Sequence, residues 1–196
     1  MRRIFKWGVE NERVPPSVYH GLAAVAPLKR GRSDARETEP IRPVPDAYVD
    51  AIRDYVSEQV WAIIELQRLT GMRSGEVCIM RAGDIDMTGR LWEYRPARHK
   101  TEHWGADRIV HLGPRAQEVV KPFLRADLDR YLFDPRDAEE TRLRAAELAR
   151  KTPRTCGNRR GTNRKRKPKR SPGDRYTPAS YGRAIKRAFE RTNADR

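Results

Sequence analysis

A chain of 196 residues is long enough for one domain of ordinary size, or for one domain with part of another. Its 42 lysines and arginines against 27 acidic residues give a formal net charge of +15, and hydrophobic residues make up only 37%. We therefore expect part of the chain to lie outside any core, and a polyanion such as nucleic acid as the partner. No apolar run approaches the ~20 residues of a membrane span, and the N-terminal residues lack the pattern of a signal peptide, which argues against a membrane or secreted protein.

The N-terminal part of the sequence predicts short helices followed by a linker. Residues 2–10 have the apolar spacing of one short helix, and residues 17–26 allow another after two prolines. Residues 29–45 are charged and contain three prolines, which favour an extended backbone. We therefore place a domain boundary at 29–45, between residues 1–28 and residues 46–196.

The next region predicts helices with clear boundaries. Asp46 and Ser57 are each expected to cap a helix by accepting from its first free N–H groups. Gly71 stands where the second of these helices should end in a left-handed residue. Ser74 is then expected to cap a short helix that ends near Gly83.

Two strands are predicted in the middle of the chain. Residues 91–95 and 108–112 alternate in polarity, and a long polar hairpin tip lies between them. Residues 84–89 are expected to form a turn in which Ile85 is buried. With helices on both sides, this pattern predicts an α+β fold that is mainly helical, with a small antiparallel hairpin or sheet.

The C-terminal part predicts two helices separated by a basic tract. Residues 137–150 form a charged helix that we expect to be mostly solvated, and Pro178 occupies the first position of the last helix. Tyr181, Ile185 and Phe189 fall on one face of that helix at four-residue steps, and we expect Tyr181 to belong to the core.

The tract at 151–175 carries eleven lysines and arginines and one acid, a net charge of +10. Its prolines and glycines disfavour regular structure, so we expect it to order only on a partner. Its densest part supplies candidate phosphate contacts, namely Arg164, Lys165, Arg166, Lys167, Lys169 and Arg170. A flexible, solvated basic segment without a partner is the alternative interpretation.

The two cysteines, Cys78 and Cys156, lack the spacing of a disulfide framework. We expect Cys78 to be a buried thiol on a helix and Cys156 to be exposed in a loop, which indicates a reducing compartment. The histidines at 99, 103 and 111 are too few and lie on a predicted hairpin, so we expect no metal site.

Arg73 lies in a corner between two predicted helices. Glu76 falls in the first turn of the second helix, where the helix dipole favours a negative charge. A guanidinium held there suits a phosphate, because its planar fork donates two parallel hydrogen bonds. A simple ion pair between Arg73 and Glu76, with no ligand, is an equally open alternative.

Taken in order, these residues resemble the catalytic domain of the tyrosine recombinases, the phage integrase family. The resemblance covers about residues 45–192 and rests on four segments, namely 70–76 (TGMRSGE), 83–86 (GDID), 99–101 (HKT) and 111–115 (HLGPR). Residues 176–181 (YTPASY) fit the helix that precedes the central motif of the family.

The resemblance implies roles for single residues. Arg73 would hold the scissile phosphate, Glu76 would buttress Arg73, and Lys100 at the hairpin tip would protonate the departing 5′ oxygen. A lysine that only contacts a backbone phosphate is the alternative for Lys100. His99, Thr101 and His103 on the same tip are candidates for contact with DNA.

The implied reaction cuts one DNA strand through a 3′-phosphotyrosyl link and rejoins it to another strand, without a metal or other cofactor. We expect double-stranded DNA as the partner, with further protomers bound on it, and neither a membrane nor a small-molecule substrate. The expected location is the cytoplasm, in association with the nucleoid.

The sequence departs from the family in its last part. The family needs a His-x-x-Arg pair and a tyrosine nucleophile, but none of the four histidines is followed by arginine at the third position. Tyr176 and Tyr181 precede the expected place of the nucleophile. We therefore expect a recombinase fragment that is inactive alone, with a partial catalytic domain at 46–196 and residues 1–28 as a remnant of an N-terminal helical DNA-binding domain.

Two other interpretations stay open at this point. A non-catalytic basic DNA-binding protein would use the basic tract and the hairpin tip for phosphate contacts, with strong salt dependence. An RNA-binding protein of ribosomal type fits the composition, but it leaves the Arg73 corner unexplained and the sequence shows no aromatic platform.

Overall fold

In the computed structural model the chain divides into two units, residues 1–43 and 44–196. The structure describes residues 2–32, 34–99, 105, 107–153, 155 and 173–195. The first unit contains helices α1 (Arg2–Glu10) and α2 (Pro16–Ala24), which pack on each other. Helix α1 has the predicted bounds, and the described residues from 25 to 43 form neither helix nor strand.

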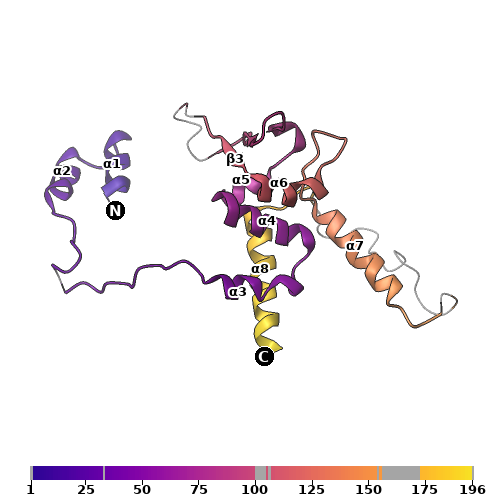
Figure 1. The fold of residues 1–196 in the computed structure, drawn as a ribbon. Helices are drawn as coiled ribbons and strands as arrows, with labels where there is room; N and C mark the ends of the chain where they lie inside the picture. The colour runs from indigo at the N-terminus through magenta and orange to yellow at the C-terminus, as the bar shows by residue number, and fades with distance from the viewer. Residues whose placement is uncertain are drawn as a thin grey trace. The chain divides into compact units, whose positions relative to one another are not determined.

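Helix α4 (Glu58–Thr70) lies at the centre of the second unit (Figure 1). The Ser57 hydroxyl caps it as predicted, accepting from the Val60 N–H at 3.3 Å. Ile63 and Leu66 of α4 are fully buried. The helix packs against four others, namely α5 (Ser74–Cys78), α6 (Pro114–Val120), α7 (Pro135–Leu148) and α8 (Pro178–Ala194). It therefore carries the core that holds the rest of the unit.

A three-stranded antiparallel sheet packs on this helical core, with strand order β1-β2-β3. Its strands are β1 (Ile85–Asp86), β2 (Trp92–Tyr94) and β3 (Val110–Leu112). Tyr94 lies between Ile85 and Val110 in register, and all three side chains are buried. The predicted strand pair is confirmed, whereas β1 forms where we expected only a turn. The mainly helical α+β fold is confirmed as well.

Two predicted caps are wrong, because each helix begins one residue earlier than expected. Helix α3 (Asp46–Asp50) begins after Pro45, and the Asp46 carboxylate instead pairs with Arg68 at 2.9 Å. A 3₁₀ turn, η1 (Arg53–Tyr55), follows α3. Ser74 is the first residue of α5 and Arg73 is its N-cap.

The C-terminal helices follow the predicted pattern with one difference. Helix α7 has no buried residue, as expected for a solvated helix, and the Thr177 hydroxyl caps α8. Tyr181 is buried, but Phe189 is 44% exposed, and Ala188 is buried in its place. Four-residue steps drift around a helix of ~3.6 residues per turn, so Phe189 leaves the packed face. Two further 3₁₀ turns complete the unit, η2 (Ala82–Asp84) and η4 (Lys121–Phe123).

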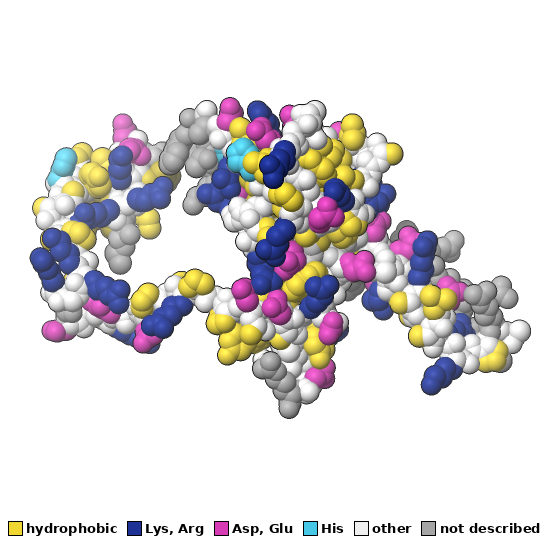
Figure 2. All heavy atoms as spheres, in the orientation of Figure 1, with side chains coloured by type: hydrophobic (Ala, Val, Ile, Leu, Met, Phe, Trp, Pro, Cys, Tyr) yellow, Lys and Arg dark blue, Asp and Glu magenta, His cyan; other side chains and the backbone are white. Residues whose placement is uncertain are grey.

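The surface charge is mixed where it can be seen. On the face drawn in Figure 2, acidic and basic side chains alternate over the second unit. Throughout the part of the chain that the structure describes, no helix is long and apolar enough to cross a membrane.

Candidate anion-binding pocket

The corner between α4 and α5 fixes the backbone of Arg73 on both sides. Gly71 ends α4 with a φ of +67°, as predicted, and its N–H donates to the Gln67 carbonyl at 2.9 Å. The Gln67 side-chain amide donates to the Met72 carbonyl at 3.0 Å, and the Met72 side chain is buried. Arg73 then has an extended backbone as the N-cap of α5.

Glu76 holds the Arg73 side chain. The Glu76 side chain is only 3% exposed, and its carboxylate accepts from the Arg73 N–H at 3.0 Å and from Arg73 Nη1 at 2.8 Å. Arg108 Nη2 lies 3.4 Å from the other side of the carboxylate. Burial raises the pKa of Glu76, but hydrogen bonds from Arg73 and the charge of Arg108 outweigh it and hold the pKa below 4.5. The group is therefore an ionised, buried support.

Residues of the sheet hold Glu76 in place. The Tyr94 hydroxyl on β2 donates to the Glu76 carbonyl at 2.7 Å, and Tyr94 is fully buried. Arg108 precedes β3, so the central strand β2 and the segment that leads into the edge strand β3 both reach the corner. The position of the Arg73 guanidinium thus depends on one helix end and one sheet.

Arg73 opens onto a pocket of about 900 Å³. The Arg73 side chain remains 53% exposed, so the donors that Glu76 does not use face solvent. The charged and aromatic residues that line the pocket come from four separate parts of the chain, namely Arg73, Glu76, Arg81, Arg98, His99, Tyr131 and Arg175. Among the described residues in this lining, Glu76 is the one acid against four arginines, so the pocket has a net charge of +3 with His99 neutral.

Tyr131 gathers two of these arginines. The guanidinium carbons of Arg81 and Arg175 lie 4.6 and 4.8 Å from the centre of its ring. Both arginines also donate to the Tyr131 hydroxyl, Arg81 at 2.9 Å. Such cation–π contacts hold guanidinium groups in place without neutralising their charge. The cluster therefore adds fixed positive charge to the pocket.

Three of the pocket arginines differ from those arginines of the unit that carboxylates neutralise. Arg68 pairs with three carboxylates, and Arg136 with the fully buried Asp134. Over the described ranges, by contrast, Arg81, Arg98 and Arg175 have no carboxylate within ion-pair distance. Cations in a hollow without a carboxylate in ion-pair distance attract an anion, and guanidinium forks match phosphate geometry. The pocket can therefore bind a phosphate or a related oxyanion.

The structure brings together three of the residues that the sequence singled out. Arg73, Glu76 and His99 line one pocket. The remaining predicted site residues lie outside the described residues, namely Lys100, Thr101, His103, Arg164, Lys165, Arg166, Lys167, Lys169 and Arg170. The same holds for Cys156, whereas Cys78 is buried as predicted and burial raises the pKa of its thiol to about 11.

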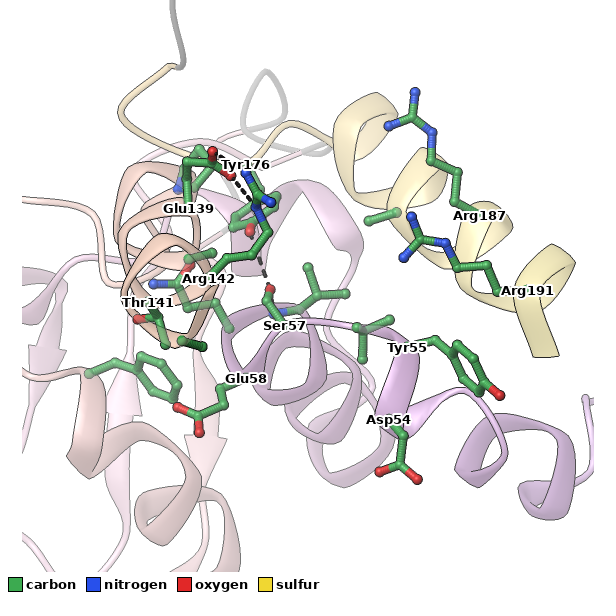
Figure 3. Close-up of a pocket in the computed structure, with 18 residues that line it drawn as sticks. Asp54, Tyr55, Ser57, Glu58, Glu139, Thr141, Arg142, Tyr176, Arg187 and Arg191 are labelled. Carbon is green, nitrogen blue, oxygen red and sulfur yellow. Dashed lines mark hydrogen bonds and ion pairs between the residues drawn. The ribbon is translucent and has the colours of Figure 1, made fainter. Parts of the chain in front are cut away.

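The tyrosines around the start of α8, Tyr176 and Tyr181, do not line the pocket of Arg73. Tyr181 is buried, its hydroxyl donates to Gln67 Oε1 at 2.7 Å, and burial raises its pKa. Tyr176 is buried too and lines a different hollow of about 660 Å³ between α4, α7 and α8 (Figure 3). There its hydroxyl lies 3.5 Å from the Ser57 hydroxyl, and burial raises its pKa. Neither phenol is placed or activated as a nucleophile toward the pocket.

Sequence reasoning missed four residues that shape the pocket, namely Arg81, Arg108, Tyr131 and Arg175. Tyr131 is anchored by its neighbour Leu132, which is fully buried and donates its N–H to the Met80 carbonyl at 2.9 Å. The apolar pair after Tyr131 predicts a buried segment, but no local signal indicates which distant arginines it meets.

Within the part of the chain that is described, no three histidine, cysteine, aspartate or glutamate side chains are grouped to hold a metal ion. Comparisons with protein-family models, curated proteins and solved structures gave no match.

Proposed function

We propose that the second unit is the phosphate-binding part of a site-specific DNA recombinase of the tyrosine type. The observation that carries the proposal is the half-exposed Arg73 guanidinium, held by the buried carboxylate of Glu76 at the edge of an arginine-lined pocket. In this proposal Arg73 binds the scissile phosphate of double-stranded DNA.

The chemistry of strand transfer explains why a fixed guanidinium is useful. Attack on a phosphodiester places extra negative charge on the non-bridging oxygens in the transition state. A guanidinium that is already in position stabilises this charge without reorganisation, so it favours the transition state over the ground state. The ion pair with Glu76 keeps Arg73 in position but leaves donors for the phosphate.

The hairpin between β2 and β3 supports a role for Lys100. Arg98 and His99 line the pocket with Arg73, and Lys100 is the next residue in the sequence. An ammonium group there would protonate the 5′ oxygen that leaves, which is a poor leaving group without a proton. His99, Thr101 and His103 would add contacts to the DNA backbone.

A non-catalytic DNA-binding protein is the second candidate, and the two tyrosines favour it. Tyr176 and Tyr181 are buried and do not line the pocket, and the sequence has no His-x-x-Arg pair. For both candidate functions we expect no covalent adduct between this chain and a nicked duplex. A protein–DNA band that survives a denaturing gel would contradict that expectation, and a Tyr131→Phe variant would test the tyrosine that lines the pocket.

A binding experiment separates the two candidates without requiring cleavage. The probe is a labelled duplex with a gap of one phosphate, flanked by hydroxyls, to which orthovanadate is added as a transition-state mimic. A recombinase pocket should bind this probe about 100-fold more tightly than an intact duplex, at the lower end for transition-state analogues. Arg73→Gln should remove the preference, because the preference depends on the guanidinium.

The matched control is Arg144→Gln, which removes one positive charge from an exposed side chain of α7 that pairs with Glu140. It should keep the preference for the vanadate probe. The recombinase proposal would be refuted if the unmodified chain bound both duplexes with equal affinity and Arg73→Gln behaved in the same way. The non-catalytic DNA-binding protein would then be the remaining candidate.

A further inference from the structure

A second part of the pocket is built for an anion beside Arg73. Tyr131 is anchored by the buried Leu132, and Arg175 is anchored by the buried Tyr176 that follows it. Arg81 and Tyr131 face each other across an antiparallel bridge between their two segments. Three separate segments of the chain thus converge on one phenol ring.

The hydrogen bonding leaves most donors of this cluster available. Each of the two guanidinium groups gives a hydrogen bond to the Tyr131 hydroxyl, which leaves further N–H groups on each. Over the described ranges no carboxylate lies within ion-pair distance of Arg81 or Arg175. Arg73 has its own support in Glu76 and does not share this cluster.

The volume of the pocket exceeds what one phosphate needs. At about 900 Å³ it lies near the upper end of ligand pockets, which span roughly 300–1,000 Å³. A strand of nucleic acid offers phosphates at regular short spacing, so a pocket of this size can take two of them. A single site at Arg73 would leave the cluster around Tyr131 without a ligand.

We propose that Arg81 and Arg175, held on Tyr131, form a second phosphate subsite that binds a neighbouring phosphate of the same DNA strand. The subsite rests on the proposed function, since it takes the ligand of Arg73 to be a DNA backbone. It fixes the line along which the strand runs through the pocket, because two anchored phosphates define a line and one does not.

The salt dependence of duplex binding measures the number of phosphate contacts. Each phosphate contact adds about 0.9 to the magnitude of the slope of log K against log salt. The measurement is fluorescence anisotropy of a labelled duplex with the full chain, over a series of salt concentrations. We expect Arg73→Gln and the double variant Arg81→Gln/Arg175→Gln each to lower the slope by about 0.9, and the triple variant by about 1.8. Arg144→Gln, the exposed control, should leave it unchanged.

The outcomes separate the subsite from the proposed function. A triple variant with the same slope as Arg73→Gln would overturn the second subsite and leave the role of Arg73 intact. A slope that falls in the double variant but not in Arg73→Gln would support the subsite and contradict the proposed role of Arg73.

A milder variant covers the case in which the double variant does not fold, which circular dichroism will show. Tyr131→Phe keeps the ring and both charges but removes the oxygen that accepts from the two arginines. We expect it to weaken duplex binding about threefold with the slope unchanged, as for the loss of one modest hydrogen bond on each side. Binding equal to that of the unmodified chain would overturn the subsite.

Discussion

Replacing Glu76 by glutamine tests the support of Arg73 most directly, since it removes the charge and keeps the shape. The carboxylate is 3% exposed and accepts from the Arg73 N–H, from the Arg73 side chain and from Arg108. Hydrogen bonds between charged groups contribute about 1.5–3 kcal/mol each to folding, and a glutamine oxygen keeps one of them. Because both arginines are partly exposed, solvent screens the loss, and we expect Glu76→Gln to lower the free energy of unfolding by about 2–3 kcal/mol.

The assay is urea unfolding followed by tryptophan fluorescence and circular dichroism. The control is Glu118→Gln, which breaks an ion pair with Lys121 at 2.6 Å whose two side chains are 71% and 50% exposed. An exposed pair of this kind contributes at most about 1 kcal/mol. If Glu76→Gln cost no more than Glu118→Gln, the corner would not depend on its buried carboxylate, and this reasoning would be wrong.

The loss of stability caused by Glu76→Gln should depend on pH in a direction that the pKa of Glu76 determines. The pKa of Glu76 in the folded chain lies below its ordinary value of 4.5. A group with a depressed pKa stabilises the fold above its unfolded pKa and loses that contribution as pH falls through the folded pKa. The difference between the unmodified chain and Glu76→Gln should therefore be constant from pH 7 to about pH 5 and shrink in more acidic solution. A difference that grew on acidification would contradict the assignment.

The effect of Glu76→Gln on DNA binding shows whether Glu76 acts by positioning Arg73 or only by its charge. Losing an acid makes the chain more positive, which on charge alone strengthens binding to any duplex. If Glu76 positions Arg73, the same change should reduce the preference for the vanadate probe about tenfold. Stronger binding with the preference intact would mean that Arg73 needs no support.

Three further outcomes follow from the structure and the sequence. Gly71→Ala should destabilise the chain by about 1 kcal/mol in thermal unfolding, because Gly71 has a φ of +67°, whereas Gly75→Ala inside α5 should be neutral or stabilising. The Cys78 thiol should resist a thiol reagent at pH 8 until the chain unfolds, because burial raises its pKa to about 11. Deleting residues 156–172, which carry eight lysines and arginines and no acid, should remove most of the salt slope of duplex binding; an unchanged slope would exclude the tract from the interface.

The sequence was sufficient for features that depend on neighbouring residues. The end of α4 at Gly71, the Ser57 cap and the start of α8 at Thr177 each follow from one or two residues whose backbone preference is strong. The strand pair could be predicted because alternating polarity is also local. The predicted Ser74 cap failed because α5 begins one residue earlier, and the Glu76 and Val77 N–H groups donate to the Arg73 carbonyl.

Features that join distant segments could not be predicted in the same way. Strand β1 has only two residues, too few for a periodic signal, and forms because Ile85 meets Tyr94 in the sheet. The cluster on Tyr131 joins residues that are 50 and 44 positions away in the sequence. Nothing in the local pattern at Arg81 distinguishes it from the solvated arginines of α7.

The gathering of arginines around one pocket is the physical basis for expecting a ligand. Arg68 and Arg136 are neutralised by carboxylates, whereas the pocket brings four guanidinium groups together with one carboxylate in its lining. Four guanidinium groups around one hollow repel each other, and the one acid in the lining is already bound to Arg73 and Arg108. This repulsion lowers the stability of the chain without a ligand. A bound polyanion relieves it, which raises the affinity for the polyanion. We therefore expect a duplex to raise the melting temperature of the chain, and Arg81→Gln/Arg175→Gln to reduce that increase while leaving the free chain as stable as before, or more so.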